Sequence, residues 1–525
     1  MFSMMISGSV HGVDGRAIAV EVDIASGLPQ VNIVGLPDPA VRESIDRVRA
    51  ALRNCGFVFP LERVTINLAP ADLRKEGTAF DLAIAAGILA ASGQLPGELF
   101  AGMLLIGELA LDGAVRPVPG VLAMVEQARR AGIGRVMLPA ANVAEAALIG
   151  GMERFALTHL DELGAPGRPR DWAPLRRAAD LACAGVPGEA NATAPSREGG
   201  EAGGCGDYGD VIGQPIAKRA LLIAAAGRHN ILLSGPPGTG KTMLVRRLPG
   251  ILPDLTEQEA LEVTKIYSAA GQLPAGVSSL IRERPFRSPH HTISTGGLIG
   301  GGTIPKPGEV TLAHRGVLFL DELPEFSRQA LEVLRQPLED RFVTIARARA
   351  VFRFPSSFML AASMNPCPCG YWGHDSVTDD RSCHCTSVQI ARYRAKLSGP
   401  LLDRIDMQIE VPRPASYDMP NGEMTTAMMR EKVAAARERQ EARRRMTGID
   451  WNGDLSGAAL RRTARLSKDS SLLLREAFDT MGISLRAHDR VLKLARTIAD
   501  VEERDTIDPE HIAEAIQYRK LDLQS

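Results

Sequence analysis

The chain has 525 residues and an ordinary globular composition, with 45% hydrophobic, 23% charged and 4% aromatic residues. Its 61 basic and 62 acidic side chains give a formal net charge of -1, so a nucleic acid would have to be bound by a local basic patch. The length predicts about three or four domains, and the composition excludes a disordered or fibrous protein. The sequence has no run of roughly 20 uncharged apolar residues and no signal-peptide pattern at its start, so we expect a cytoplasmic protein.

Residues 1–163 alternate strand-like and helix-like patterns, which predicts an α+β domain or an α/β domain. The predicted strands are Ala17–Ile24, Val64–Leu68 and Met103–Ile106, and the predicted helices are Phe80–Ala91 and Ala123–Ala131. Residues 164–206 are rich in Gly, Ala, Glu and Ser without an apolar period, which predicts a flexible linker. Within this linker, Pro174–Ala184 has a helical pattern.

Residues 207–413 contain short, strongly apolar runs, which are typical of a parallel sheet covered on both faces. These predicted strands are Ile231–Ser234, Val317–Leu320 and Phe358–Ala362. Residues 414–525 form the last predicted domain, which is helical from Thr425 to Leu523 because charged runs alternate with Leu and Ala at helical spacing.

The segment GPPGTGKT follows the strand Ile231–Ser234 and is the strongest functional signal in the chain. Its glycines let the backbone curl so that successive N–H groups face an anion, ahead of a helix predicted at Met243–Leu248. Lys241 is expected to reach the β- and γ-phosphates of ATP, and Thr242 is expected to hold Mg²⁺. The predicted ATP-binding residues are Gly235, Pro236, Pro237, Gly238, Thr239, Gly240, Lys241 and Thr242.

A second part of the same site is predicted where the apolar strand Val317–Leu320 ends in Asp321 and Glu322. The carboxyl ends of strands in α/β sheets are where ligands bind. Asp321 is expected to coordinate Mg²⁺, and Glu322 is expected to act as the general base that polarises the attacking water. An acidic pair beside a phosphate loop predicts ATP hydrolysis in addition to ATP binding.

Four of the seven cysteines form two Cys-x-Cys pairs in one short stretch, namely Cys367, Cys369, Cys383 and Cys385. Four thiolates at tetrahedral reach suit Zn²⁺, although the usual pairs have two intervening residues. One sulfur per pair, completed by His374 or His384, is an alternative ligand set. A reduced loop or a redox-labile pair is the alternative without metal. A metal here would have a structural role.

With these motifs, the chain resembles the AAA+ ATPases and, more narrowly, the magnesium-chelatase-like group that includes the YifB/ComM family. Asp210–Gln214 resembles the segment that opens the AAA+ core, and Phe286–His291 begins a segment similar to the helix-two insert of this group. The resemblance implies an α/β fold with a P-loop NTPase core, a helical lid and a preceding α+β domain. Further catalytic residues implied by the resemblance are Asn365, Arg404 and Arg486.

Each of these three residues has an implied role. Asn365 matches the sensor-one position and would help to orient the lytic water, and Arg486 matches the sensor-two arginine at the start of a lid helix. Arg404 matches the arginine finger, whose guanidinium neutralises the charge that develops on the γ-phosphate of a neighbouring subunit. The resemblance therefore implies a ring, which we expect to be a hexamer.

The N-terminal domain resembles the proteolytic domain of Lon, through Gly107–Gly113 and Gly132–Pro139. Lon-type enzymes use a serine that is activated by a lysine, but this chain has Ala79 and Leu122 at the two expected positions. Thr78 lies beside Ala79, but no lysine stands at the expected place. Without a nucleophile and a base no acyl-enzyme can form, so we expect no proteolysis. The domain would then serve as an oligomerisation or DNA-facing collar.

The segment Arg341–Arg353 is predicted to be a β-hairpin. In the resembling family this hairpin and the helix-two insert face the central pore, so the predicted DNA contacts are Lys306, Arg347 and Arg349. A solvated edge hairpin is the alternative reading of this segment. The resemblance implies an ATP-driven ring motor that translocates on DNA, in branch migration or unwinding during natural transformation. The alternative function is a chelatase-type ATPase that remodels a partner protein.

Overall fold

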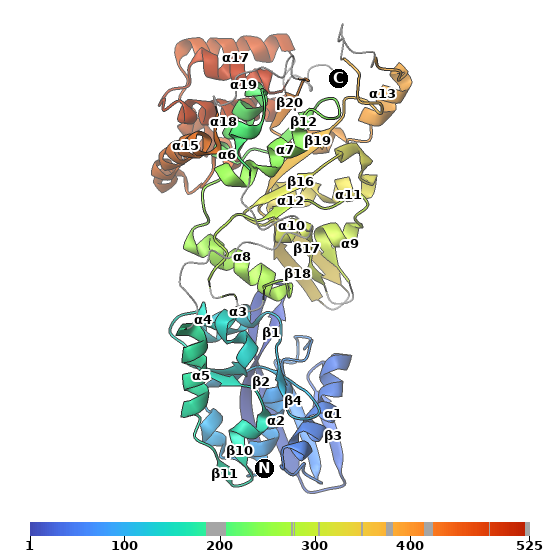
Figure 1. The fold of residues 1–525 in the computed structure, drawn as a ribbon, viewed down its shortest axis with the longest axis vertical. Helices are drawn as coiled ribbons and strands as arrows, with labels where there is room; N and C mark the ends of the chain where they lie inside the picture. The colour runs from blue at the N-terminus through green and yellow to red at the C-terminus, as the bar shows by residue number, and fades with distance from the viewer. Residues whose placement is uncertain are drawn as a thin grey trace. The chain divides into compact units, whose positions relative to one another are not determined.

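The computed structural model describes residues 1–184, 206–274, 277, 279–302, 305–347, 350–373, 382–413, 424–481 and 484–519. The chain divides into two compact units (Figure 1). The first unit contains Met1–Pro195 and Thr256–Arg282, and the second contains Ser196–Leu255 and Glu283–Ser525. In the described part of the chain, none of the helices is long and apolar enough to cross a membrane.

The first unit is built on a seven-stranded mixed sheet in the order β3-β4-β2-β1-β5-β8-β9. Its strands are β1 (Phe2–His11), β2 (Asp14–Ala25), β3 (Gln30–Val34), β4 (Arg63–Ala69), β5 (Met103–Leu105), β8 (Arg135–Pro139) and β9 (Glu153–Leu157). Short two-stranded ladders join β6 (Glu108–Leu109) to β7 (Val115–Arg116), and β10 (Gly164–Ala165) to β11 (Arg168–Pro169). The three strands predicted from the alternating pattern are confirmed by β2, β4 and β5.

The helices of the first unit are α1 (Pro39–Asn54), α2 (Asp81–Ala91), α3 (Val121–Arg130), α4 (Val143–Ala147), α5 (Ala173–Ala184) and α8 (Glu257–Ala269). The two predicted helices are confirmed by α2 and α3. Ten of the eleven residues of α2 are buried, which agrees with its nearly continuous apolar sequence. The helix α8 follows the phosphate loop in the chain but packs against α3 of the first unit.

The structure differs from the predicted linker of residues 164–206 in its first part. The helix α5 packs against β9, and Trp172 and Leu175 are 8% and 9% exposed in the core of the first unit. The indole ring of Trp172 lies 5.2 Å from the ring of Phe100, between centroids. Residues 164–184 therefore belong to the first unit because these apolar side chains are buried there, and residues 185–205 lie outside the described residues.

The second unit is built on a five-stranded parallel sheet in the order β13-β16-β19-β12-β20. Its strands are β12 (Ile231–Ser234), β13 (Phe286–Arg287), β16 (Val317–Leu320), β19 (Met359–Met364) and β20 (Met407–Glu410). The strands predicted from their apolar runs are confirmed, and β12, β16 and β19 are buried throughout. Two hairpins project from this core, β14 (Gly300–Gly301) with β15 (Lys306–Pro307), and β17 (Phe342–Arg347) with β18 (Ala350–Pro355).

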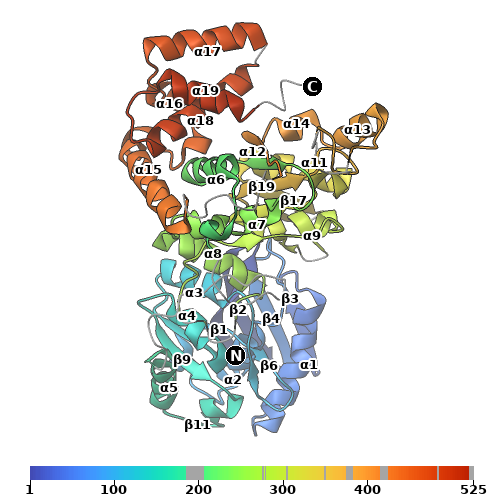
Figure 2. The ribbon, with the colours of Figure 1, turned by 45° about the horizontal axis from the view of Figure 1, so that its top comes forward.

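The helices around this sheet are α6 (Pro215–Gly227), α7 (Lys241–Arg246), α9 (Thr295–Ile299), α10 (Glu309–Leu312), α11 (Arg328–Val333), α12 (Arg335–Asp340), α13 (Ser387–Arg394) and α14 (Gly399–Leu402). The lid helices are α15 (Thr426–Thr447), α16 (Gly457–Thr463), α17 (Lys468–Met481), α18 (Leu485–Val501) and α19 (Pro509–Gln517). Figure 2 shows the lid helices gathered together, and α15 and α18 both contact α6 of the core. The predicted helical character of the last segment is confirmed in its described part.

Candidate nucleotide-binding site

The phosphate loop joins β12 to α7 and owes its shape to three glycines. Gly238 and Gly240 have φ angles of 77° and 85°, a left-handed conformation that glycine adopts without steric cost. At position 235 there is no space for a side chain, because a Cβ atom on Gly235 would lie 2.2 Å from the carbonyl oxygen of Val411. The helix α7 begins at Lys241, directly after the loop. The predicted ATP-binding residues thus form one continuous curl between a buried strand and a helix.

Lys241 lies within this curl and is 8% exposed. Its Nζ atom donates to the carbonyl oxygens of Gly235 at 2.6 Å and Pro236 at 2.8 Å, and to Oδ1 of Asn365 at 3.3 Å. Burial lowers the pKa of the Lys241 ammonium group, and nearby carboxylates oppose this effect. The structure therefore brings the predicted phosphate-binding lysine and the predicted sensor-one amide together.

The predicted metal ligands Thr242 and Asp321 are in contact. The hydroxyl of Thr242 donates to Oδ2 of Asp321 at 2.8 Å, and the hydroxyl of Ser363 donates to Oδ1. Ser363 reaches Asp321 because β16 and β19 are adjacent and parallel, with Leu320 paired to Ala362. A hydroxyl and a carboxylate oxygen are ligands that Mg²⁺ accepts in phosphate sites. No local pattern assigns Ser363 a role, since its contact with Asp321 depends on the strand register.

The carboxylate of Glu322 lies near the loop that follows β13. Its backbone has a φ of 54°, and its side chain is 57% exposed. One carboxylate oxygen lies 3.8 Å from Nδ1 of His291, whose ring stacks against His290 with 4.1 Å between centroids. His291 belongs to the predicted insert segment, and no pattern in the sequence relates it to Glu322. The predicted general base is therefore open to solvent and next to a histidine of the insert.

Arg404 and the phosphate loop lie at opposite ends of the strand β12. Its carbonyl oxygen accepts a hydrogen bond of 2.9 Å from Nδ2 of Asn230, the residue before β12. The phosphate loop follows the end of β12, about 13 Å away for a strand of this length. The Arg404 guanidinium donates to the carbonyl oxygen of Pro400 at 2.7 Å and pairs with Glu339 of α12. Arg404 is thus separated from the phosphate loop of its own chain.

Arg486 is the second residue of α18 and is exposed. The hydrogen bond from Arg404 lowers the pKa of Glu339, and the charge of Arg486 lowers it further. One turn later on the same helix, Arg490 lies 3.8 Å from Asp403 in the segment that carries Arg404. The structure therefore brings Arg404 and Arg486 together around Glu339.

The two hairpins of the second unit are also in contact. A guanidinium nitrogen of Arg347 on β17 donates to the carbonyl oxygen of Gly302 at 3.2 Å, directly after β14. Lys306 on β15 and Arg347 are both exposed. The predicted hairpin at Arg341–Arg353 is confirmed by β17 and β18, but Arg349 lies outside the described residues.

The four clustered cysteines come together in space. The Sγ atom of Cys367 lies 3.3 Å from that of Cys369 and 3.7 Å from that of Cys383, and the latter two are 3.6 Å apart. With Cys385 included, all four sulfur atoms lie within 4.8 Å of one another. This cluster can bind a metal ion. It consists of both sulfurs of each pair, whereas the alternative ligand His374 lies outside the described residues.

In the first unit, Ala79 and Leu122 are buried in the apolar core at 9% and 0% exposure. The amide of Leu122 donates to Oε1 of Glu145 at 2.9 Å. The hydroxyl of Thr78 donates to the carboxylate of Glu108. Neither Ala79 nor Leu122 can supply a nucleophile or a base.

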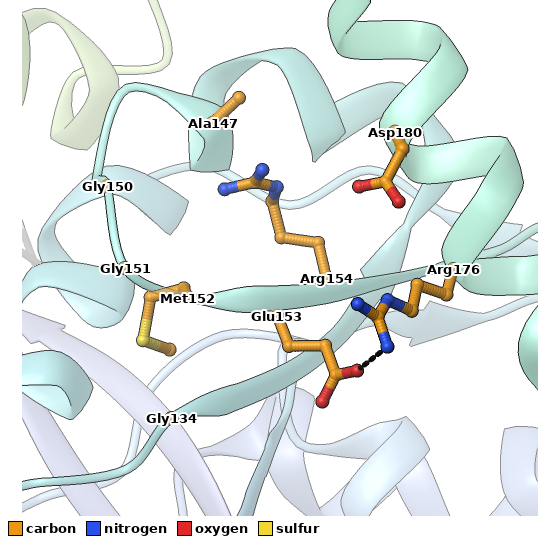
Figure 3. Close-up of a pocket in the computed structure, with 9 residues that line it drawn as sticks. All are labelled: Gly134, Ala147, Gly150, Gly151, Met152, Glu153, Arg154, Arg176 and Asp180. Atoms are coloured by element: carbon orange, nitrogen blue, oxygen red, sulfur yellow. Dashed lines mark ion pairs between the residues drawn. The ribbon is translucent and has the colours of Figure 1, made fainter.

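A separate hollow of about 430 Å³ lies in the first unit (Figure 3). Its lining residues are Gly134, Ala147, Gly150, Gly151, Met152, Glu153, Arg154, Arg176 and Asp180. Arg176 pairs with Glu153 at 2.6 Å, and two acidic side chains balance two arginines in the lining. The hollow contains none of the predicted site residues, and we assign it no function.

A parallel sheet with a phosphate loop and an acidic pair at its carboxyl edge, followed by a helical lid, defines an ATPase of the AAA+ type. The family described as magnesium chelatase, subunit ChlI, matches residues 207–419, and its C-terminal part matches residues 423–519. The family described as subunit ChlI of Mg-chelatase matches residues 20–142.

Full-length relatives narrow this assignment. YifB of Salmonella typhimurium is 44% identical over 518 residues, which cover 97% of this chain and 96% of YifB. The competence protein ComM of Haemophilus influenzae is 41% identical over 524 residues, covering 99% and 97% of the two chains. Lon protease 2 of Bacillus subtilis is 31% identical over 151 residues, a match that covers 27% of this chain. The chain belongs to the YifB/ComM family of magnesium-chelatase-like AAA+ ATPases.

Proposed function

We propose that the protein is an ATP-hydrolysing ring motor that binds and translocates on DNA, with branch migration or unwinding during natural transformation as its activity. The position of Arg404 is the observation that supports a ring. Arg404 lies near the amino-terminal end of β12, whereas the phosphate loop follows the carboxyl-terminal end of this strand. An arginine that cannot serve its own phosphate loop is available to the ATP of a neighbour. The name of the relative ComM, a competence protein, supports the biological process.

In each subunit, Lys241 binds the β- and γ-phosphates, and Thr242 and Asp321 hold Mg²⁺, which neutralises charge on the phosphates when bound. Glu322 accepts a proton from the attacking water, and its exposure leaves room for that water. Asn365 already contacts the ammonium group of Lys241 at 3.3 Å, so it lies within reach of the γ-phosphate that the lysine binds.

Arg404 and Arg486 are proposed to act in trans. Both lie around Glu339, an exposed carboxylate that neutralises them within one subunit. In a ring, the γ-phosphate of the neighbour replaces Glu339 as the partner of Arg404, because a triphosphate carries more charge than one carboxylate. A ring of repeated head-to-tail interfaces completes every site in this way, and we propose a hexamer.

DNA contact is proposed for the two adjoining hairpins. Lys306 and Arg347 present cationic groups on β15 and β17, and the contact between Arg347 and Gly302 links the hairpins into one surface. Phosphate contacts of this kind are independent of sequence and sensitive to salt, as a translocating motor requires. Arg349 is proposed for the same role from the sequence alone.

The cysteine cluster and the first unit are also proposed to have defined roles. The metal of the cysteine cluster is proposed to be Zn²⁺, because a tetrahedral site with Zn–S bonds of about 2.3 Å has S–S edges of about 3.8 Å, close to the observed separations. The first unit is proposed to lack protease activity and to act as an oligomerisation or DNA-facing collar, since Ala79 and Leu122 are core residues.

Mixing two inactive variants tests the shared site. Glu322→Gln removes the base and Arg404→Ala removes the trans arginine, so each variant alone should lose ATP turnover. A mixture contains interfaces in which an intact Glu322 meets an intact Arg404, and turnover should reappear. If the mixture stays inactive while the variants co-assemble, the trans role of Arg404 is wrong.

The DNA proposal needs a separate measurement. ATP turnover and DNA affinity are compared without DNA and with single-stranded, duplex and four-way-junction DNA, for the wild type and for Arg347→Ala. Arg347→Ala should weaken binding to all DNA forms and lower the salt slope by about one, whereas the matched surface variant Arg475→Ala should not. If no DNA form changes turnover and a partner protein does, the chelatase-type remodelling function replaces this proposal.

A further inference from the structure

The cysteine cluster lies directly against the ATP site. Cys367 is fully buried and follows the sensor-one residue Asn365 by two positions. From there the chain turns back, with the amide of Gly370 donating to the carbonyl oxygen of Cys367 at 3.0 Å. The amide of Trp372 donates to Sγ of Cys367 at 3.3 Å. The loop of residues 367–373, here called the cysteine loop, is therefore folded around the sulfur atoms.

One residue of this loop touches the phosphate loop. A Cβ atom built on Gly370 would lie 2.6 Å from Cδ and 3.3 Å from Cγ of the Pro237 ring. The backbone of Gly370 thus packs on Pro237 with no space for even a methyl group. Because a proline ring is stiff and its φ is fixed, this contact passes a displacement of the cysteine loop to the phosphate-loop backbone.

An aromatic contact holds the other face of the cysteine loop. The guanidinium group of Arg394, at the end of α13, lies 4.2 Å from the centroid of the Trp372 ring. The described part of the loop contributes no strand to any sheet and no helix. Because the four sulfur atoms lie within 4.8 Å of one another, a metal bound by them would fix the shape of this loop, as in small zinc-stabilised modules.

We propose that a Zn²⁺ ion bound by Cys367, Cys369, Cys383 and Cys385 braces the phosphate loop through the Gly370–Pro237 contact, so that ATP binding depends on the metal. The zinc thiolate fixes the cysteine loop, the loop supports Pro237, and Pro237 sets the spacing of the N–H groups that receive the phosphates. The zinc site then controls the ATP site without taking part in hydrolysis. This inference rests on the proposed function only in its assignment of the phosphate loop to ATP, and DNA plays no part in it.

Metal content and nucleotide affinity test whether the cysteines bind zinc and whether ATP binding depends on it. Full-length protein is assayed for zinc and for binding of a fluorescent ATP analogue with Mg²⁺, without DNA. Wild type and the control Cys55→Ser, whose thiol lies in the first unit, should hold one zinc per chain. Cys383→Ser should lose zinc and bind the analogue at least about tenfold more weakly, a loss of about 1.4 kcal/mol. Zinc-free wild type that binds the analogue at full affinity overturns the proposal, and so does wild type purified without zinc that does not take it up.

A pair of glycine variants distinguishes the effect of the Gly370–Pro237 contact from the effect of zinc binding. Gly370→Ala keeps all four thiols but forces a methyl group into Pro237, whereas a Cβ on Gly373 would meet nothing within 4 Å. The two residues have similar φ angles of 88° and 78°, so both substitutions carry the same backbone strain. We expect both variants to hold one zinc, and Gly370→Ala alone to lose analogue affinity. Equal affinities in the two variants would show that the cysteine loop does not brace the phosphate loop. Loss of zinc from Gly370→Ala would also contradict the proposal, because a change outside the four thiols would then control the metal.

Discussion

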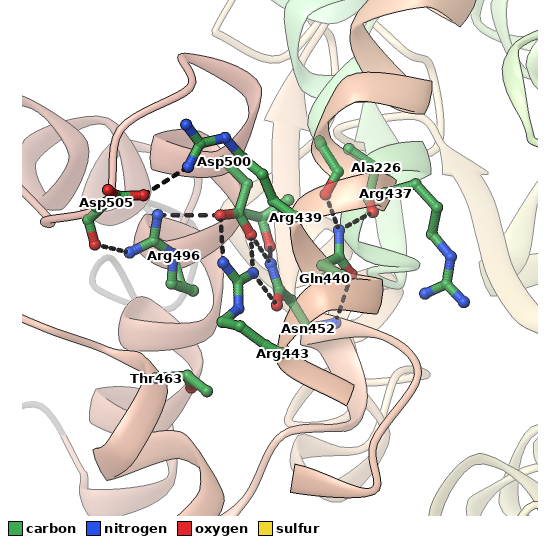
Figure 4. Close-up of polar contacts among 12 residues, drawn as sticks. Ala226, Arg437, Arg439, Gln440, Arg443, Asn452, Thr463, Arg496, Asp500 and Asp505 are labelled. Atoms are coloured by element: carbon green, nitrogen blue, oxygen red, sulfur yellow. Dashed lines mark hydrogen bonds and ion pairs between the residues drawn. The ribbon is translucent and has the colours of Figure 1, made fainter. Parts of the chain in front are cut away.

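Asp500 is a fully buried carboxylate in α18 and the centre of the polar contacts that hold the lid together (Figure 4). Arg443 of α15 donates to both of its oxygens, with 2.9 Å to Oδ1. Arg496 donates to Oδ1 at 3.0 Å, and Nδ2 of Asn452 donates to Oδ2 at 2.7 Å. The substitution Asp500→Asn keeps the shape of the side chain and removes its charge, so it tests the charge alone.

The expected loss of lid stability depends on the arginine charges that remain after the carboxylate of Asp500 is removed. Arg496 is 1% exposed and Arg443 is 20% exposed, and both lose their shared counter-charge. Removing one partner of a buried ion pair costs about 3–5 kcal/mol, because the remaining charge is left without compensation. Arg496 keeps its hydrogen bond of 2.7 Å to the carbonyl oxygen of Asp505, which favours the lower end of that range. About 3 kcal/mol corresponds to an opening equilibrium of α18 raised by roughly a hundredfold.

Hydrogen exchange measures this opening directly, because the amides of α18 exchange through local unfolding of the lid. In Asp500→Asn they should exchange roughly a hundredfold faster than in the wild type. The matched control is Asp505→Asn, whose carboxylate is 87% exposed and pairs with Arg439 at 2.7 Å. Exposed pairs contribute little, so the control should behave as the wild type. Similar exchange rates in the two variants would refute the argument that the buried charge holds α18 in place.

Three shorter predictions concern the ATP site and the first unit. Lys241→Ala should lower ATP turnover by at least about a hundredfold in a phosphate-release assay, since it removes the charge inside the phosphate loop. Ser363→Ala removes a hydroxyl that positions Asp321, and should raise the Mg²⁺ concentration for half-maximal turnover by about tenfold in a magnesium titration. Burial raises the pKa of Asp81 to about 6, above the unfolded value of about 3.9, so its contribution to stability is full below about pH 4 and is lost as the pH rises through 6. Protection of the Leu109 amide, which donates to Asp81 at 3.1 Å, should show this loss, and Asp81→Asn should abolish it.

The parts of the site that are continuous in sequence could be predicted without a structure. The phosphate loop is defined by glycines and a lysine within eight residues, and the strand and helix on either side have local apolar patterns. The same holds for the acidic pair after β16, which follows four apolar residues. Local pattern is sufficient there because each element buries its own apolar run.

Contacts between distant segments were beyond prediction, since they depend on strand register and packing. The bond from Ser363 to Asp321 exists because β16 and β19 pair in one register, and one residue of slip would turn Ser363 to the other face. The helix α8 follows the phosphate loop by sequence, and its amphipathic pattern does not say that it packs on α3 of the first unit. The contact of Gly370 with Pro237 likewise joins two loops that are far apart in the chain.

A chain of contacts through the lid connects Arg486 to the core of the second unit. Arg486 stands at the start of α18, and Asp500 near its end is bound by Arg443 of α15. The helix α15 in turn is bound to the core, where Nε2 of Gln440 donates to the carbonyl oxygen of Ala226 in α6 at 2.8 Å (Figure 4). A rigid helix transmits a movement at one end to the other. A change in the core around α6 would therefore move Arg486 relative to Glu339. In the proposed ring, this movement would couple the state of one subunit to the arginines that act on the next.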